Sequence, residues 1–378
     1  MKIGIDAFGC DHARSGLGTY MLSFVSNIPA SDAAGSSEIS ATFELFGSEI
    51  DRFTYTSGKD VSFVSPGVSD NLSAERTWHF TGVNKFVQAQ GYDVVLYPAP
   101  ERVLPISFKV PGIAIVNSVL SSLVEGKKDW IQKIQIKRGL FKVPKIIAAS
   151  NFIKQDLIDH GIDAEKIEVV YNGIDHKLFF PQIAMEDVVD IKPFAIKRPY
   201  FIYGSRLSGP EKKHRELITA FSLFKKKTGL PHRLVLAGSD GAYSAEVHKA
   251  AFESEFASDI FLTGYFPHES FPQLYSGSEA LLFPSVNEGV GLPVLEAMAT
   301  GVPVACADSG ALPEIAGDAA LLFNPDDSEA FAAVLEKLAS DKLLCAGMVQ
   351  KGLKRAQGFT WESTIAQTLR VAQNVVKS

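Results

Sequence analysis

The chain has 378 residues, 46% hydrophobic and 21% charged, which is ordinary for a soluble globular protein with room for two domains. Lys and Arg number 37 against 43 Asp and Glu, and this net charge of −6 gives no reason to expect a nucleic-acid partner. Cys10, Cys306 and Cys345 lie far apart without metal-ligand spacing, so we expect reduced thiols in a cytoplasmic protein. The apolar N-terminal stretch is too short for a signal peptide, and no apolar run approaches the roughly 20 residues that span a bilayer.

The first half of the chain alternates short apolar runs with amphipathic stretches, which is typical of βαβ units and a parallel sheet. Helical patterns follow several of the runs, notably at 17–28, 74–90 and 151–160. The strands predicted here are 2–7, 42–46, 61–64, 93–97, 112–116, 145–149 and 167–170.

The segment 179–199 contains three prolines and no clear periodicity, which predicts a linker between two domains. The alternation then restarts, with strands predicted at 200–203, 233–237, 260–263, 280–284, 302–305 and 320–323. Two doubly wound domains would place a cleft between the carboxyl ends of their strands, where ligands of such sheets bind.

Basic residues follow the first strand of the second domain. Arg206 comes directly after that strand, and Lys212 lies just before a helical stretch. Both side chains suit a diphosphate leaving group, whose negative charge grows as its bond to a sugar breaks. Taken alone, Lys212 and Lys213 also fit a solvated turn with no function. We find no Asp-any-Asp triplet to hold a divalent ion, so we expect no metal.

The segment 280–299 combines a buried strand, a loop with Glu288 beside two glycines, and a helix with Glu296 in its first turns. Such a strand-loop-helix presents backbone N–H groups and a positive helix dipole, which favour an anion. The two carboxylates would repel phosphate and instead suit the hydroxyls of a sugar or ribose. Glu296 could also be a simple dipole or capping residue. Phosphate together with sugar indicates a nucleotide sugar.

Five segments of the chain together carry a family resemblance. They are SGLGTY at 15–20, YNGID at 171–175, GSRLSGPEKKHRELITAF, EGVGLPVLEAMATGVPV and SGALPEIAGDAALLFNP at 309–325. In this order they resemble the family-four retaining glycosyltransferases of the GT-B fold, over nearly the whole chain. The resemblance implies an α/β protein with two doubly wound Rossmann-like domains and an interdomain cleft. We expect an acceptor-side domain at 1–188, a nucleotide-sugar domain at 189–357, and a C-terminal helix at 358–378, including Val371, that crosses back.

The resemblance also implies roles for single residues. Glu288 would contact donor-sugar hydroxyls and Glu296 the ribose, while Arg206 and Lys212 would clamp the diphosphate. The remaining donor-binding positions expected are Gly16, Gly18, Gly264, Gly289, Val290, Gly291 and Leu292.

Asn117 departs from the family pattern, because members commonly carry a His at the end of this strand. Asn can donate and accept hydrogen bonds but cannot titrate. Either Asn117 keeps a positioning role and the leaving phosphate takes the acceptor's proton, or the donor or acceptor differs from the common ones. We favour the first and therefore include Asn117 among the catalytic candidates. His12, near the first glycine loop, is a weaker substitute, and a loop histidine without a function is the simpler interpretation.

The segment 126–145 is rich in basic residues, with the single acid Asp129. Its cations are Lys127, Lys128, Lys133, Lys137, Arg138, Lys142 and Lys145, interleaved with Trp130 and aliphatic side chains. This pattern fits a helix lying on an anionic membrane. It fits an ordinary amphipathic helix packed on the sheet equally well.

The predicted function is retaining transfer of a hexose from a UDP-, GDP- or ADP-sugar to a saccharide or lipid-linked hydroxyl acceptor, without cofactor or metal. Location would be cytoplasmic, with peripheral attachment to the inner membrane face as an option. The alternatives are a GT-B nucleotide-sugar epimerase and a non-catalytic nucleotide-sugar-binding protein.

Overall fold

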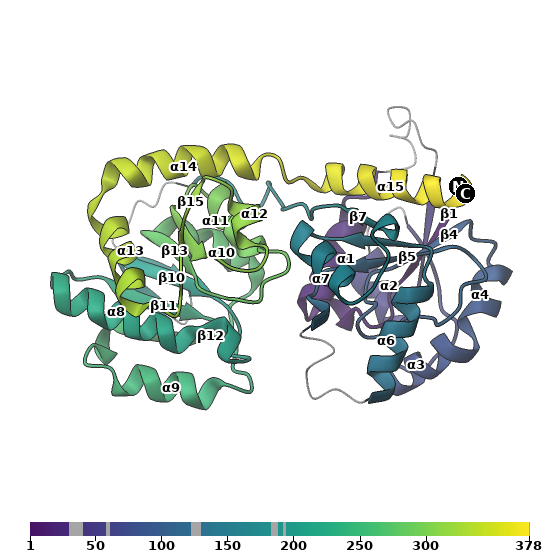
Figure 1. Ribbon diagram of the computed structural model, residues 1–378, viewed down its shortest axis with the longest axis horizontal. Helices are drawn as coiled ribbons and strands as arrows, with labels where there is room; N and C mark the ends of the chain where they lie inside the picture. Colours follow the sequence, from purple (N-terminus) through teal and green to yellow (C-terminus); the bar gives the residue numbers. More distant parts are fainter. Residues whose placement is uncertain (30–40, 58–60, 122–129, 183–187, 192–193, 378) are drawn as a thin grey trace. The chain divides into compact units, whose positions relative to one another are not determined.

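The computed structural model describes residues 1–377 apart from 30–40, 58–60, 122–129, 183–187 and 192–193. It divides into two compact units (Figure 1). Unit 1 comprises Met1–Gly173 and Trp361–Ser378, and unit 2 comprises Ile174–Thr360. Lys127, Lys128 and Asp129 of the basic segment lie outside the described residues.

Unit 1 contains a parallel sheet with strand order β3-β2-β1-β4-β5-β6-β7. Its central strands are nearly continuous runs of buried apolar residues, as expected where helices cover both faces of a sheet. The strands are β1 Lys2–Asp6, β2 Thr42–Phe46, β3 Ser62–Val64, β4 Val94–Tyr97, β5 Gly112–Val116, β6 Lys145–Ala148 and β7 Ile167–Val169. The helices are α1 Gly16–Ser26, α2 Glu49–Thr56, α3 Leu72–Thr81, α4 Val83–Ala89, α6 Trp130–Lys142, α7 Asn151–Asp159 and α15 Trp361–Lys377.

The single helix predicted over 74–90 is wrong, because the structure has two helices that meet at Gly82. A Cβ at Gly82 would lie 2.6 Å from Cδ1 of Trp78, so the Trp78 ring packs across this position. The ring also contacts Phe8 and Phe86, with centroid distances of 5.2 and 5.6 Å. The break therefore lets a large aromatic side chain reach the core.

Unit 2 contains a second parallel sheet, with strand order β12-β11-β10-β13-β14-β15. Its strands are β10 Tyr200–Gly204, β11 Arg233–Ala237, β12 Ile260–Gly264, β13 Ala280–Phe283, β14 Val304–Ala307 and β15 Ala320–Phe323. Its helices are α8 His214–Thr228, α9 Ser244–Glu253, α10 Phe271–Gly277, α11 Leu292–Ala299, α12 Leu312–Ala316, α13 Ser328–Ser340 and α14 Lys342–Ala356. The prediction of two doubly wound α/β sheets is confirmed.

The predicted linker at 179–199 instead contains an antiparallel hairpin, formed by β8 Val188–Ile191 and β9 Phe194–Lys197. Burial alternates along β8, with Val189 and Ile191 turned inward. A Cβ on Gly277 of α10 would lie 2.2 Å from Cγ2 of Val189, so the hairpin packs closely on that helix. This apolar contact holds β8 against α10.

The boundary between the units lies before the hairpin, at 173/174, rather than at 188/189. Ile174 pairs with Thr360 in an isolated parallel bridge, and Phe179 packs its ring 6.3 Å from Tyr275. Both contacts assign 174–179 to unit 2. Helix α15 belongs to unit 1, where Trp361 packs 5.5 Å from the Tyr20 ring and Val371 lies in the core. No helix in the described part of the chain combines the length and apolarity needed to cross a bilayer.

Candidate functional site

The strand order of unit 2 reverses between β10 and β13, which are hydrogen-bonded neighbours although far apart in sequence. Ligands of doubly wound sheets bind outside the carboxyl ends of the strands at such a reversal. Arg206 follows β10 and Glu288 follows β13. The sheet topology therefore brings the predicted basic and acidic groups to the same edge.

Lys212 and Glu288 contact each other directly at this edge. Nζ of Lys212 lies 3.2 Å from Oε2 of Glu288 and donates a second hydrogen bond to Oγ of Ser285 at 3.4 Å. The backbone N–H of Val286 also donates to the carbonyl of Glu211, 3.0 Å away. The loop after β10 and the loop after β13 are thus joined by side-chain and main-chain bonds.

The neighbouring Lys213 has a different environment. Its Nζ pairs with Asp326 at 2.5 Å and Glu216 at 3.7 Å. The hydrogen bond that Lys213 donates to Asp326 raises the pKa of Lys213 above its ordinary value. Lys213 therefore fastens the start of α8 to the loop after β15, whereas Lys212 faces the strand-order reversal.

Arg206 is exposed, and its Nε donates to the carbonyl of Asp240 at 3.3 Å. Among the described carboxylates, none forms an ion pair with Arg206. The backbone beside it is tightly arranged, because a Cβ on Gly238 would lie 2.0 Å from the carbonyl oxygen of Ser205. The guanidinium thus extends from a closely packed loop and has donors available for an anion.

The loop that carries Glu288 is held by the loop after β14. The N–H of Ala311 donates to the carbonyl of Glu288 at 2.8 Å, and Oγ of Ser309 donates to the carbonyl of Val286 at 2.7 Å. Gly310 has a φ of +64°, and a Cβ there would lie 2.6 Å from the Glu288 carbonyl oxygen. Only glycine allows this approach, so Gly310 positions the backbone of Glu288.

Helix α11 begins after Gly291, whose φ of 70° and ψ of 29° are left-handed. No side chain caps the helix at this N-cap. Val290 and Leu292 on either side are half-buried, whereas Gly289 and Gly291 are buried. The predicted donor-binding backbone from Gly289 to Leu292 thus forms the turn into α11, where the positive end of the helix dipole lies.

Glu296 of α11 is only 7% exposed and hydrogen-bonds through Oε1 to Nε2 of His268, 2.9 Å away. Burial alone would lower the pKa of His268, but the hydrogen bond and charge of Glu296 raise it overall. Gly264, at the end of β12, has a φ of +73° and open space beside its Cα. His268, in the short 3-10 helix between β12 and α10, thus contacts Glu296, the residue predicted to bind the ribose.

His214 lies buried beneath the Lys212 loop, with its ring 4.8 Å from the Tyr203 ring. Burial, and secondarily the charge of Lys212, lowers the pKa of His214 to about 4. The imidazole is therefore neutral at neutral pH and adds no charge to the site.

Asn117 of unit 1 lies at the carboxyl end of β5, where its Oδ1 accepts a hydrogen bond from Nδ2 of Asn172 at 2.9 Å. The buried Nδ2 of Asn117 has no hydrogen-bond partner among the described residues. Asn172 belongs to the YNGID segment. Its contact fixes the amide of Asn117 and leaves an N–H donor for a ligand.

The two glycines predicted near the first loop differ in their surroundings. A Cβ on Gly18 would lie 2.2 Å from the carbonyl oxygen of Cys10, whereas a Cβ on Gly16 would meet nothing within 4 Å. Gly18 therefore lets α1 pack against the turn at Asp11, His12 and Ala13, all of which have positive φ. Gly16 lies at the start of α1 with open space beside it.

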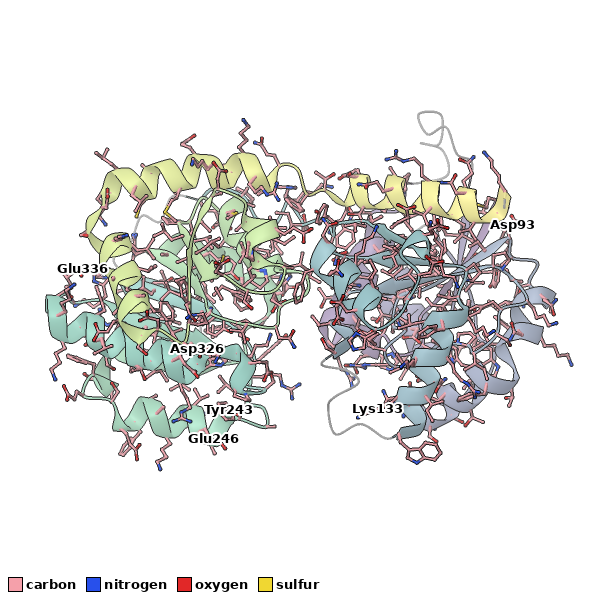
Figure 2. The ribbon with its side chains drawn as sticks, in the orientation of Figure 1. Asp93, Lys133, Tyr243, Glu246, Asp326 and Glu336 are labelled. Carbon is pink, nitrogen blue, oxygen red and sulfur yellow. The ribbon has the colours of Figure 1, made fainter. Side chains whose placement is uncertain are left out.

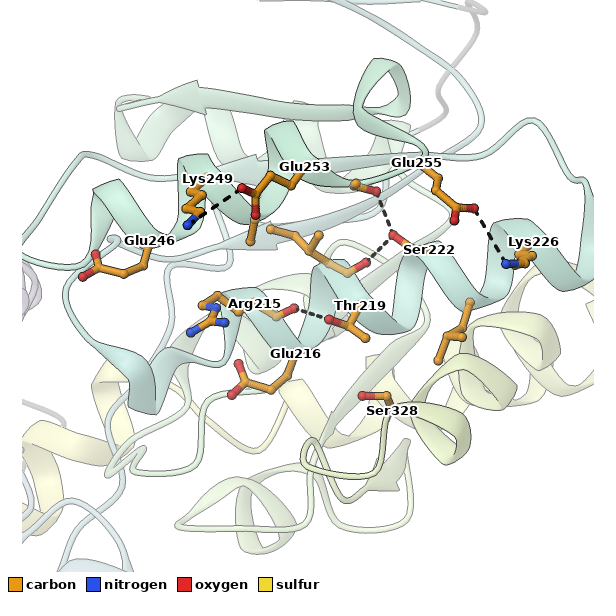
Figure 3. Close-up of a pocket in the computed structure, with 14 residues that line it drawn as sticks. Arg215, Glu216, Thr219, Ser222, Lys226, Glu246, Lys249, Glu253, Glu255 and Ser328 are labelled. Carbon is orange, nitrogen blue, oxygen red and sulfur yellow. Dashed lines mark hydrogen bonds and ion pairs between the residues drawn. The ribbon is translucent and has the colours of Figure 1, made fainter.

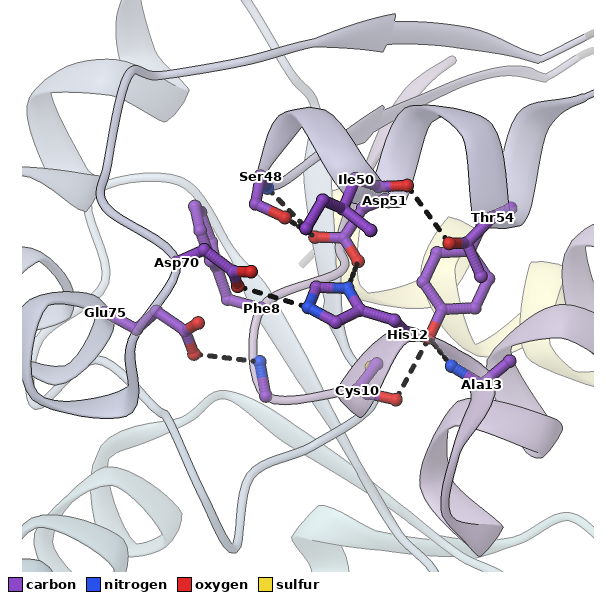
Figure 4. Close-up of polar contacts among 12 residues, drawn as sticks. Phe8, Cys10, His12, Ala13, Ser48, Ile50, Asp51, Thr54, Asp70 and Glu75 are labelled. Carbon is purple, nitrogen blue, oxygen red and sulfur yellow. Dashed lines mark hydrogen bonds and ion pairs between the residues drawn. The ribbon is translucent and has the colours of Figure 1, made fainter.

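His12 is clamped between two carboxylates (Figure 4). Its Nδ1 lies 2.8 Å from Asp51 and its Nε2 3.1 Å from Asp70. Burial lowers the pKa of His12, but its bonds to Asp51 and Asp70 outweigh this and raise it. These two contacts hold the ring in place and give it a structural role.

A cavity of about 280 Å³ opens beside His12. Asp11, Asp70, Glu75, Arg14 and Arg102 line it and present both donors and acceptors. The strand order of unit 1 reverses between β1 and β4, and residues that follow these two strands, Phe8 and Arg102 among them, contribute to the cavity. The site is therefore the unit 1 counterpart of the edge that carries Lys212 and Glu288.

A larger hollow of about 740 Å³ lies between α8 and α9 (Figure 3). Two ion pairs lie within it, Lys226 with Glu255 and Lys249 with Glu253. It contains none of the predicted site residues and runs along exposed helix faces. We therefore assign no ligand to it.

Family comparisons agree with the motifs. The family description "Glycosyl transferases group 1" matches residues 186–355, and "Glycosyltransferase Family 4" matches residues 60–178. The chain belongs to the family-four glycosyltransferases.

Among curated relatives, the O-antigen chain mannosyltransferase B of Escherichia coli is 34% identical over 160 residues, 42% of each chain. The MMP alpha-(1->4)-mannosyltransferase of Mycolicibacterium hassiacum is 27% identical over 255 residues, 66% of this chain and 59% of that protein. The matches thus span about half the length of these relatives.

Solved structures of similar fold cover nearly the whole chain. A sucrose-phosphate synthase from Thermosynechococcus elongatus aligns with a TM-score of 0.74 and 17% identity, covering 99% of both chains. Anabaena HepE in complex with UDP and glucose aligns with a TM-score of 0.74 and 19% identity, covering 99% of this chain and 100% of that one. The fold of this family-four member is GT-B.

Proposed function

We propose that the chain is a retaining glycosyltransferase that moves a hexose from a nucleotide-diphosphate sugar to a hydroxyl acceptor. The observation that carries this is the contact of Lys212 with Glu288 and Ser285 where the strand order of unit 2 reverses. A cation and a carboxylate at one such edge suit a ligand with adjoining phosphate and sugar groups. The curated relatives support a mannosyl donor and a saccharide acceptor, since their names describe mannosyltransferases.

In the proposed reaction, the bond between the anomeric carbon and the β-phosphate oxygen breaks while the acceptor oxygen bonds to that carbon. Attack occurs on the face that the nucleotide leaves, and the acceptor's proton passes to the departing phosphate. Lys212 and Arg206 would stabilise the charge that develops on the diphosphate. The turn into α11 would add backbone donors and its helix dipole. No metal is needed in this scheme, which EDTA treatment of the active protein tests.

Glu288 would hold hydroxyls of the donor sugar, and Glu296, oriented by His268, would hold the ribose. Asn117 would donate its remaining N–H to a sugar hydroxyl. The cavity beside His12 is the proposed entry point for a saccharide acceptor, because carboxylates and guanidinium groups hydrogen-bond well to hydroxyls.

The first experiment is a thermal-shift screen of the purified chain against UDP-, GDP- and ADP-sugars. A donor bound only by the folded protein raises its melting temperature. The donor found should then be prepared with a radiolabel in its sugar and incubated with the protein and candidate saccharide acceptors. Transfer with α configuration retained supports the proposal, whereas an isomerised donor without acceptor would establish an epimerase. Stabilisation by a donor without turnover would establish a binding protein.

A further inference from the structure

Helix α6 of unit 1 has two different faces. Its inner face is seated on the unit, where Gln132 donates to the carbonyl of Glu101 and Gln135 to the carbonyl of Leu104, both at 3.1 Å. Ile136 and Leu140 are 2% and 1% exposed on the same side. A Cβ on Gly139 would lie 2.6 Å from Leu104, so the helix packs closely. The packing role of the helix is fully met by this inner face.

The opposite side carries apolar side chains that are largely exposed. Trp130 is 69% exposed, Ile134 44% and Phe141 40%. With 3.6 residues per turn, these three positions lie on one side of the helix, away from Ile136 and Leu140. We call Trp130, Ile134 and Phe141, with the cations among them, the outer face of α6.

The cations of the outer face are Lys133, Lys137, Arg138 and Lys142, and Figure 2 labels Lys133. None of the four forms an ion pair with a carboxylate in the described part of the chain. Nζ of Lys137 lies 5.9 Å from the centroid of the Phe141 ring, so charge and apolar surface are adjacent. Lys145 is different, because it pairs with Glu168 at 3.0 Å beyond the end of the helix.

We propose that the outer face of α6 binds the surface of an anionic lipid bilayer. Trp and Phe side chains insert at the boundary between headgroups and acyl chains, while Lys and Arg attract anionic headgroups. No acid occurs on the helix to oppose this attraction. A groove on a protein partner would need complementary acids, whereas four cations around exposed aromatic side chains match a negative membrane surface.

The inference concerns attachment and does not depend on sugar transfer. Combined with the proposed function, it indicates an acceptor displayed at a membrane, such as a lipid-linked saccharide. A protein that transfers sugar to a soluble acceptor and ignores vesicles would overturn the inference and leave the proposed function intact. Vesicle binding without any sugar transfer would support the inference and contradict the proposed function.

Co-sedimentation with vesicles of phosphatidylglycerol and phosphatidylcholine provides the first test. We expect binding to anionic vesicles at low salt, weaker binding at high salt and none to pure phosphatidylcholine. Each basic residue near such a surface contributes about fivefold in affinity, so K137Q/K142Q should weaken binding roughly 25-fold. The matched control is K226Q/K249Q on unit 2, which removes the same charge from exposed helix positions. Equal loss in both double variants, or no sedimentation at low salt, would overturn the proposal.

Tryptophan fluorescence provides a test specific to the aromatic insertion. Trp361 is buried and Trp78 is half-buried, so Trp130 is the tryptophan best placed to sense lipid. Its emission should shift to the blue when anionic vesicles are added, and W130F should lose the shift while still sedimenting. An unchanged emission from vesicle-bound wild-type protein would exclude insertion by this face.

Discussion

Lys212 Nζ and Glu288 Oε2 lie 3.2 Å apart, so the group proposed to hold the donor's diphosphate contacts the group proposed to hold its sugar. Each is 23% or less exposed at its side chain. The desolvation of two partly buried charges offsets much of their attraction, so the main consequence of this pair is positional. A bound donor must replace this contact with two of its own, one from its diphosphate to Lys212 and one from its sugar to Glu288.

We expect Lys212→Met and Glu288→Gln to have different effects on ligands. Lys212→Met should weaken binding of the nucleoside diphosphate alone and lower kcat/KM by about 10²- to 10³-fold, because it removes charge stabilisation of the leaving group. Glu288→Gln should lower transfer similarly but leave diphosphate binding equal or tighter, since a competing carboxylate is removed. Isothermal titration with the diphosphate and steady-state kinetics measure both effects.

Lys213→Met is the matched control for this pair. Lys213 contacts Asp326 and Glu216 rather than the site, so its loss should change diphosphate affinity less than about twofold. An equal loss of diphosphate affinity in Lys212→Met and Lys213→Met would show that general positive charge, not the Lys212 position, matters.

Gly310→Ala should slow sugar transfer because it displaces the backbone of Glu288. The new Cβ would lie 2.6 Å from the Glu288 carbonyl oxygen, so the loop must shift. We expect a fall in kcat/KM of about tenfold or more, because small displacements of a catalytic loop are costly. Gly229→Ala is the control, since it has the same φ of +64° but open space around it. Both variants should lose about 1 kcal/mol of stability from the left-handed backbone, measured by urea unfolding.

The strands were predictable because parallel strands buried on both faces are short apolar runs bounded by polar or glycine residues. β2, β5, β11 and β15 have the predicted bounds. The hairpin of β8 and β9 was missed because its two inward residues, Val189 and Ile191, are too few to establish a period. Its stability comes from contact with α10, which lies far along the chain.

Candidate site residues could be selected from the sequence, whereas their contact partners could not. Glycine and charge patterns after a strand identify Arg206, Lys212 and Glu288 locally. The contacts of Glu296 with His268, of Val286 with Ser309 and of Asn117 with Asn172 join residues far apart in sequence, and no local pattern encodes them. Asn172 lies 55 residues from Asn117, and His268 lies 28 residues from Glu296. The YNGID segment drew attention to Asn172, but nothing in the sequence indicated that Asn172 contacts Asn117.

The pH dependence of stability should carry the signature of His12. Its pKa is raised in the folded protein, so the stabilisation is full below the unfolded value of 6.5 and is lost as pH rises through the folded value. The melting temperature of the wild type should therefore fall as the pH rises above about 6.5. His12→Asn should flatten this fall, since Asn tolerates the left-handed φ of 46° and cannot titrate. Equal slopes in a differential scanning calorimetry series would contradict the assignment.

The side-chain oxygen and nitrogen of Asn117 have different hydrogen-bond roles. Asn172 occupies Oδ1, and the buried Nδ2 remains as a donor. Asn117→Asp keeps the shape but loses that donor, so it should raise KM or lower kcat for transfer by roughly tenfold, the value of one hydrogen bond to ligand. Asn172→Ala should give a smaller loss, since it only releases the amide. Asn117→His, which introduces the residue that the family resemblance leads us to expect here, should retain activity if Asn117 has a positioning role. Loss of transfer in Asn117→His with unchanged folding by circular dichroism would instead favour a donor or acceptor that differs from the common ones.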